Sequence, residues 1–212
     1  CAGQFEVGAA QEDLVARAIV LCLAEACGVA APSVESVITS RDHLSRTSRP
    51  PASPIDELLS GTVDRVTACP DGRLLRSAQI PAGVLPGSFN PRHAGHVGLA
   101  ETAAAMLGAP VHFEISVLNV DKPALSGEDV QRRLAQFAGQ ATVELTRAPT
   151  FVEKSRLFPG ATFVIGADTV ERLVAPRYYG DSEERMQAAL EEMAGRGIRF
   201  LVAVRRDPAG RL

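Results

Sequence analysis

The sequence predicts an α/β fold: a parallel sheet with helices on both faces, preceded by a short helical and hairpin segment. From residue 81 onward, strand-like and helix-like segments alternate about five times. Two of the strand-like segments, 111–120 and 161–168, show little polar alternation, which is typical of strands buried on both faces. Right-handed crossovers between such strands place helices on both sides of the sheet.

Length and composition limit the classes of function. At 212 residues, 46% of them hydrophobic, the chain can hold one good core. A net charge of −3 without a basic block argues against nucleic acid or an anionic membrane surface as a partner. No apolar run approaches the roughly 20 residues that a membrane helix needs. The four cysteines lack metal-ligand spacing, so we expect reduced thiols in a cytoplasmic protein.

The elements before the sheet have clear boundaries. An apolar stripe over 11–27 predicts a helix closed by Gly28, and the Ser-, Arg- and Pro-rich segment 31–53 reads as a linker. Ser53 is expected to cap a short helix that ends at Gly61. The remaining elements are predicted in this order: hairpin 62–80, strand 83–89, helix 96–108, strand 111–120, helix 126–139, strand 142–147, helix 151–158, strand 161–168, helix 169–174, helix 182–197 and strand 198–206.

Three unusual segments follow strands of this Rossmann-like arrangement. GSFNPRHAGH (87–96) follows the first, NVDKP (119–123) the second and GAD (166–168) the fourth. Ligands of open α/β sheets bind outside the carboxyl ends of the strands, where the strand order reverses. The shared position of the three segments therefore predicts a site at that edge.

The first segment has the chemistry of an anion site. Gly87 allows a tight turn, and a helix starting between His93 and His96 presents free N–H groups. Histidines three residues apart on a first helical turn point the same way and can donate to phosphate oxygens. Gly95 has no side chain, so a bulky anion can lie against that turn. The glycines follow neither G-x-G-x-x-G nor the G-K-[ST] phosphate loop. The plain alternative is that both histidines only cap the helix and pack.

GSFNPRHAGH resembles the first signature of the nucleotidylyltransferase superfamily, roughly G-x-F-[DN]-x-x-H-x-G-H. Members with GSFNP are mostly nicotinamide or nicotinate mononucleotide adenylyltransferases. LPGSFNPRHAGHVGLAE, FEISVLNVDKPALS and LFPGATFVIGADTVERLVAPRYYG are also similar to a cytidylyltransferase-like subfamily. In that subfamily the transferase domain often follows a domain similar to nicotinamide-nucleotide amidases.

The resemblance implies an enzyme that joins a nucleoside triphosphate, with ATP favoured, to a phosphorylated small-molecule acceptor and releases pyrophosphate. Nicotinamide or nicotinate mononucleotide is the expected acceptor. CTP with a phosphorylated alcohol, and a nucleotide-binding module with little turnover, remain alternatives. By the same resemblance, residues 1–30 are the terminal helix of an upstream amidase-like domain, 31–79 a linker, helix and hairpin, and 80–212 the transferase domain.

The resemblance also assigns roles to single residues. His93 and His96 would hold the triphosphate and the transition state, with Lys122 as a further phosphate ligand. Mg²⁺ would be bound mainly through the substrate phosphates. The positions expected to line the nucleotide are Gly87, Ser88, Phe89, Asn90, Gly95, Gly166 and Asp168. Lys122 could equally be a surface lysine, and Asp168 could cap the next helix.

Other positions stay open. Phe151, Tyr178 and Tyr179 are the candidates for contact with an acceptor ring. The basic side chains that follow the third strand, Arg147, Lys154 and Arg156, could contact an acceptor phosphate, but we expect them on a solvated face. The family's second signature, similar to I-S-S-T-x-I-R, does not occur after VAVRRDPAGRL, and we expect it in the native protein beyond this chain. Nothing in the sequence indicates an oligomeric state.

Overall fold

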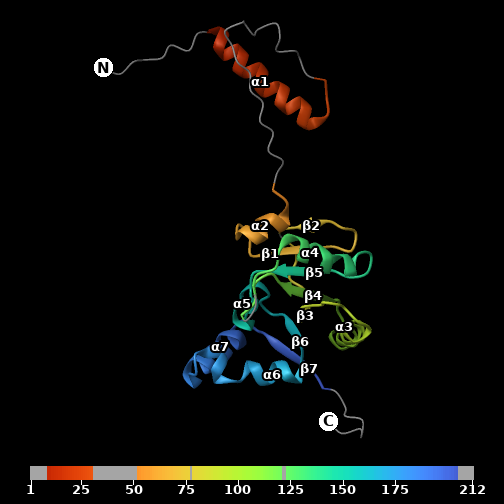
Figure 1. The fold of residues 1–212 in the computed structure, drawn as a ribbon, viewed down its shortest axis with the longest axis vertical. Helices are drawn as coiled ribbons and strands as arrows, with labels where there is room; N and C mark the ends of the chain where they lie inside the picture. Colours follow the sequence, from red (N-terminus) through yellow and green to blue (C-terminus); the bar gives the residue numbers. More distant parts are fainter. Residues whose placement is uncertain (1–8, 31–51, 77, 121–122, 205–212) are drawn as a thin grey trace, which may run out of the picture. The chain divides into compact units, whose positions relative to one another are not determined.

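The computed structural model describes residues 9–30, 52–76, 78–120 and 123–204, which fall into two compact units, 1–50 and 51–212. In the first unit the helix α1, Ala9–Cys27, ends before Gly28, as predicted (Figure 1). Most of the expected linker lies outside the described residues. No described helix is both long enough and apolar enough to cross a bilayer.

The second unit is built on one seven-stranded sheet with the order β2-β1-β5-β4-β3-β6-β7 (Figure 1). The strands from β5 to β7 in this order run parallel, whereas β1 pairs antiparallel with both β2 and β5. Their bounds are β1 Arg65–Ala68, β2 Leu74–Leu75, β3 Gly83–Pro86, β4 Val111–Ser116, β5 Val143–Thr146, β6 Thr162–Gly166 and β7 Arg199–Ala203.

The helices of this unit begin at residues with capping chemistry. Ser53, Ser126 and Thr150 each accept a hydrogen bond from the backbone N–H three residues on, which satisfies one of the free donors at a helix start. The bounds are α2 Pro54–Ser60, α3 Ala94–Leu107, α4 Gly127–Leu134, α5 Phe151–Leu157, α6 Ala167–Leu173 and α7 Glu183–Gly195, with short 3₁₀ helices η1 Ala135–Phe137 and η2 Pro176–Tyr179.

Neighbouring residues of β3 belong to different cores, because successive side chains of a strand point to opposite faces. Leu85 packs in a core with buried residues of α2, α3 and α4, whereas Val84 packs with residues from the α5, α6 and α7 side. Helices therefore cover both faces of the sheet, as the sequence predicts.

Two differences from the predicted elements have local causes. The hairpin does not merely precede the sheet: Arg65 to Ala68 pair with Thr146 to Val143, so β1 and β2 extend the sheet and make it mixed. The strand β4 ends at Ser116, short of residue 120, because the Ser116 hydroxyl donates to the carbonyl of Leu118 at 2.6 Å and turns the chain.

Candidate functional site

The strand order reverses at β3, which has β4 on one side and β6 on the other. Such a reversal opens a crevice at the carboxyl ends of the strands, the usual ligand position in α/β sheets. The loop 87–93 leaves β3 at this edge, and the turn 166–168 leaves β6 beside it. The fold thus brings two of the three predicted segments together. In the third, Lys122 lies outside the described residues and its role stays a prediction.

The two histidines form one stacked unit at the start of α3. His93 is the N-cap residue, and the ring centroids of His93 and His96 lie 3.6 Å apart with 20° between the ring planes. The backbone N–H of His93 donates to Nδ1 of His96 at 3.2 Å. His93 is exposed and His96 half-buried, so the pair faces out of the protein at the amino end of the helix.

This hydrogen bond selects a tautomer of His96. Because Nδ1 accepts, the neutral ring carries its proton on Nε2, which makes Nε2 a hydrogen-bond donor. The backbone N–H groups of the first turn and the positive end of the helix dipole add to the attraction for an anion. A Cβ at Gly95 would lie 3.1 Å from Nδ1 of His93, so a larger residue there would require the exposed His93 ring to shift by a few tenths of an ångström.

Phe89 has a different role from its neighbours in the loop. Its ring is buried, and it makes edge contacts with Phe113, Phe137 and His96 at centroid distances of 5.2, 5.5 and 4.9 Å. A Cβ on Gly87 would lie 2.7 Å from this ring. Gly87 is therefore required by the packing of Phe89, a reason that the sequence alone did not supply. Ser88 and Asn90, on either side, are exposed.

The loop is held by two side chains that the motif does not include. Gln136 Nε2 donates to the Phe89 carbonyl at 2.9 Å, and its Oε1 accepts from the Arg92 N–H at 2.8 Å, so one amide spans the Asn90–Pro91 turn. Arg133 donates to the Ser88 carbonyl at 2.9 Å. The only signal in the sequence is that Arg133 and Gln136 are three apart and thus share a helical face.

The turn after β6 is open. Gly166 is the N-cap of α6, and a Cβ built there would meet no atom within 4 Å. Asp168 is exposed and lies inside the first turn of α6. The expectation that it caps this helix is wrong, because the helix begins two residues earlier than predicted.

A cavity with a volume of about 250 Å³ opens at the same edge of the sheet as the histidine pair. Phe151, Tyr178 and Tyr179 all line it, so the structure brings the three candidate aromatic residues together. The Tyr179 hydroxyl donates to the Leu173 carbonyl at 2.8 Å, and burial raises the pKa of this phenol. Thr169 and Val120 also contribute, which places the cavity beside the segments that follow β6 and β4.

The basic residues after β5 have structural partners. Arg147 donates to the carbonyls of Leu58 and Leu59, and Arg156 pairs with Glu192. Lys154 is 5% exposed, so the expectation of a solvated face is wrong for it. Its Nζ donates to Glu114 on β4 and to the Ala148 carbonyl, both at 2.7 Å. Helix α5 turns this side chain inward, toward the sheet.

A second buried carboxylate lies next to Glu114, because Glu114 and Glu144 are register partners on β4 and β5. Burial alone would raise the pKa of Glu144. Hydrogen bonds from His112 and Thr67 and the charge of Arg65 outweigh burial and leave the pKa below its usual value. These groups form a buried polar layer under α5, separate from the histidine pair.

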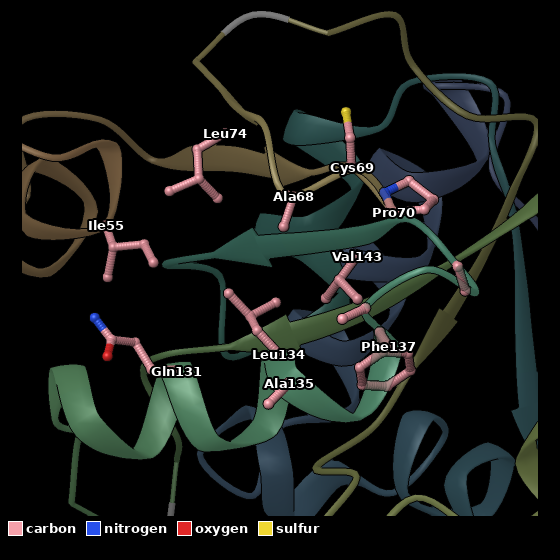
Figure 2. A pocket seen from close by; sticks show the side chains of 13 residues that line it. Ile55, Ala68, Cys69, Pro70, Leu74, Gln131, Leu134, Ala135, Phe137 and Val143 are labelled. Carbon is pink, nitrogen blue, oxygen red and sulfur yellow. The ribbon is translucent and has the colours of Figure 1, made fainter.

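Another hollow, also of about 250 Å³, lies between α2, the β1–β2 hairpin, the α4–η1 segment and β5 (Figure 2). Ala68 pairs with Val143, the first residue of β5, so this hollow opens at the amino ends of the parallel strands. Among its lining residues, only Cys69 and Gln131 have polar side chains. It lies away from the predicted site, and none of its lining side chains is charged.

Comparison of the chain with models of known protein families and with curated proteins found no match.

Proposed function

We propose that the protein is a nucleotidyltransferase that joins a nucleoside triphosphate, preferably ATP, to a phosphorylated acceptor, preferably nicotinamide or nicotinate mononucleotide. The observation that carries the proposal is the stacked pair His93 and His96 on the first turn of α3, at the point where the strand order reverses. The pair presents N–H donors and a helix dipole where a triphosphate would lie.

The chemistry needs positioning and charge stabilisation rather than a protein nucleophile. An oxygen of the acceptor phosphate attacks the α-phosphorus in line, a new P–O bond forms, and the bond from the α-phosphorus to the bridging oxygen breaks. Pyrophosphate leaves with the bonding electrons. His96 would donate from Nε2 to the oxygens on which charge develops, and His93 would bind the leaving phosphates.

Mg²⁺ belongs to this proposal as a companion of the triphosphate. The donors at the start of α3 are N–H groups, which suit phosphate oxygens, and the described residues form no group of three metal-ligating side chains. The ion would be held by phosphate oxygens and water, its usual coordination, and would offset charge on the leaving pyrophosphate.

The acceptor would occupy the cavity lined by Phe151, Tyr178 and Tyr179. An engineered cavity of about 150 Å³ holds benzene, so 250 Å³ accommodates a substituted six-membered ring. Aromatic walls favour such a ring over a flexible phosphorylated alcohol. This contrast supports a mononucleotide acceptor over the cytidylyl-transfer alternative.

The test is pyrophosphate release by the protein with Mg²⁺ and either ATP or CTP, measured with and without each mononucleotide. We expect release with ATP that depends on a mononucleotide. Release only with CTP and a phosphorylated alcohol would replace the proposal by cytidylyl transfer. Triphosphate binding without release in any combination would leave a nucleotide-binding module, and release without acceptor would indicate hydrolysis.

A further inference from the structure

The cavity beside α6 has a positive charge on its wall and no negative one. Of the residues that line it, Arg172 is the one cation and none is a carboxylate. Four hydroxyls lie on its wall, and two of them are engaged: Tyr179 donates to Leu173, and Thr150 bonds to Glu153 in a reciprocal cap. A ligand in this cavity therefore meets aromatic faces, the hydroxyls of Thr169 and Tyr178, and one guanidinium.

The guanidinium of Arg172 forms no hydrogen bond or ion pair with any of the described residues. Asp168 lies one helical turn earlier, in a position that often pairs with an arginine, but the two side chains form no ion pair. Glu153, at the start of α5, is bound to the N–H and hydroxyl of Thr150. Arg177 lies with its guanidinium 5.0 Å from the Tyr178 ring centre and adds positive charge to that wall.

We infer that this cavity selects a planar ring that carries a carboxylate over the same ring with a neutral carboxamide, and that Arg172 is the residue that makes the distinction. The inference rests on the proposed function and deepens it: of the two expected acceptors, the nicotinate form is the substrate. The planar guanidinium matches a carboxylate with two parallel N–H donors, which a carboxamide, itself part donor, cannot accept equally.

Tyrosine fluorescence can be used to measure ligand binding in this cavity. The chain has two tyrosines and no tryptophan, and both tyrosines line the cavity. Tyrosine emission of the whole protein therefore reports on ring binding there, without any requirement for turnover. Titrations would use nicotinate mononucleotide and nicotinamide mononucleotide, corrected for absorption by the ligands.

We expect the carboxylate to bind roughly 10- to 100-fold more tightly, the range that a hydrogen bond between charged groups supports. Arg172→Gln should remove this preference and leave carboxamide binding within about twofold. Arg199→Gln is the matched control, because Arg199 is exposed and lies at the amino end of β7. It should keep the preference of the wild type.

Equal affinities for the two ligands, a preference that survives Arg172→Gln, or no change of tyrosine emission with either ligand would each overturn the inference. The proposed function is read separately, from pyrophosphate release. Release that uses both mononucleotides equally would overturn the selectivity and leave transfer standing. Selective binding without release would overturn transfer and leave the ring site standing.

Discussion

At the scale of single residues, the loop 87–93 depends on one buried ring. Phe89 has a backbone φ of 43°, in the left-handed region that a residue with a side chain adopts at a cost. Its burial against Phe113 and Phe137 offsets that cost. The ring thus sets the path of the backbone between Gly87 and His93.

Gly87→Ala tests this dependence. The added methyl group would overlap the Phe89 ring, so we expect a loss of about 1–3 kcal/mol in the free energy of unfolding, the usual cost of overpacking. Urea unfolding measures it. Gly98→Ala is the control: Gly98 lies inside α3 with open space around a built Cβ, and alanine there should stabilise by about 0.5–1 kcal/mol. Equal behaviour of the two variants would contradict the account.

At the scale of elements, the segment α4–η1 holds the loop from outside. Gln136→Leu removes two hydrogen bonds to the loop backbone, so we expect a loss of about 1–3 kcal/mol and a weaker affinity for the triphosphate. Urea unfolding and a triphosphate titration measure the two effects. Gln187→Leu changes an exposed glutamine of α7 and should stay within about 0.5 kcal/mol. Unchanged triphosphate affinity in Gln136→Leu would show that the loop needs no such support.

The polar layer under α5 gives a second prediction at this scale. Lys154→Met leaves the Glu114 carboxylate buried without its cation, which should cost about 3–5 kcal/mol. Adding Glu114→Gln should restore part of that loss, because no buried charge then remains uncompensated. Arg156→Met breaks the exposed pair with Glu192 and should leave the stability close to that of the wild type, because solvent screens such a pair. If the Lys154→Met protein were as stable as the Arg156→Met protein, the buried ion pair between Lys154 and Glu114 would be contradicted.

Much of the element order is readable from the sequence, and the reasons are local. Ser53, Ser126 and Gly28 mark helix ends through capping and turn chemistry, which needs no tertiary information. The pairing of β1 with β5 cannot be predicted from the sequence, because its partners are about eighty residues apart (Arg65 with Thr146) and only packing brings them together. For the same reason the partners of Lys154 and Phe89 appear only in the fold.

At the scale of the whole molecule, the buried carboxylate of Glu144 links stability to pH. The folded pKa of Glu144 is below its ordinary value of 4.5, so its charge stabilises the fold fully above that pH and stops doing so as the pH falls through the lowered value. The stability gap between wild type and Glu144→Gln, measured by urea unfolding, should shrink below about pH 4.5. The gap between wild type and Gly98→Ala, which changes no ionisable group, should stay the same over this pH range. A gap independent of pH would contradict the assignment.

The candidate site also depends on the fold of the whole sheet. The histidine pair, the turn after β6 and the aromatic cavity come from different parts of the chain, and they share one edge because the strands from β5 to β7 run parallel. The motif residues of the loop were predictable because they are contiguous. The walls of the cavity were predictable only as separate candidates, since Phe151 and Tyr178 meet through the packing of α5, α6 and η2.

Nucleotidyl transfer is tested most directly by mass spectrometry, which detects the dinucleotide product after incubation with Mg²⁺, ATP and a mononucleotide. His96→Ala and the control His112→Gln, which changes a histidine bound to Glu144 in the polar layer, would be assayed beside the wild type. We expect product from the wild type and the control, and at least about a hundredfold less product from His96→Ala. No product from a folded wild-type protein, or equal product from His96→Ala, would contradict nucleotidyl transfer that depends on His96.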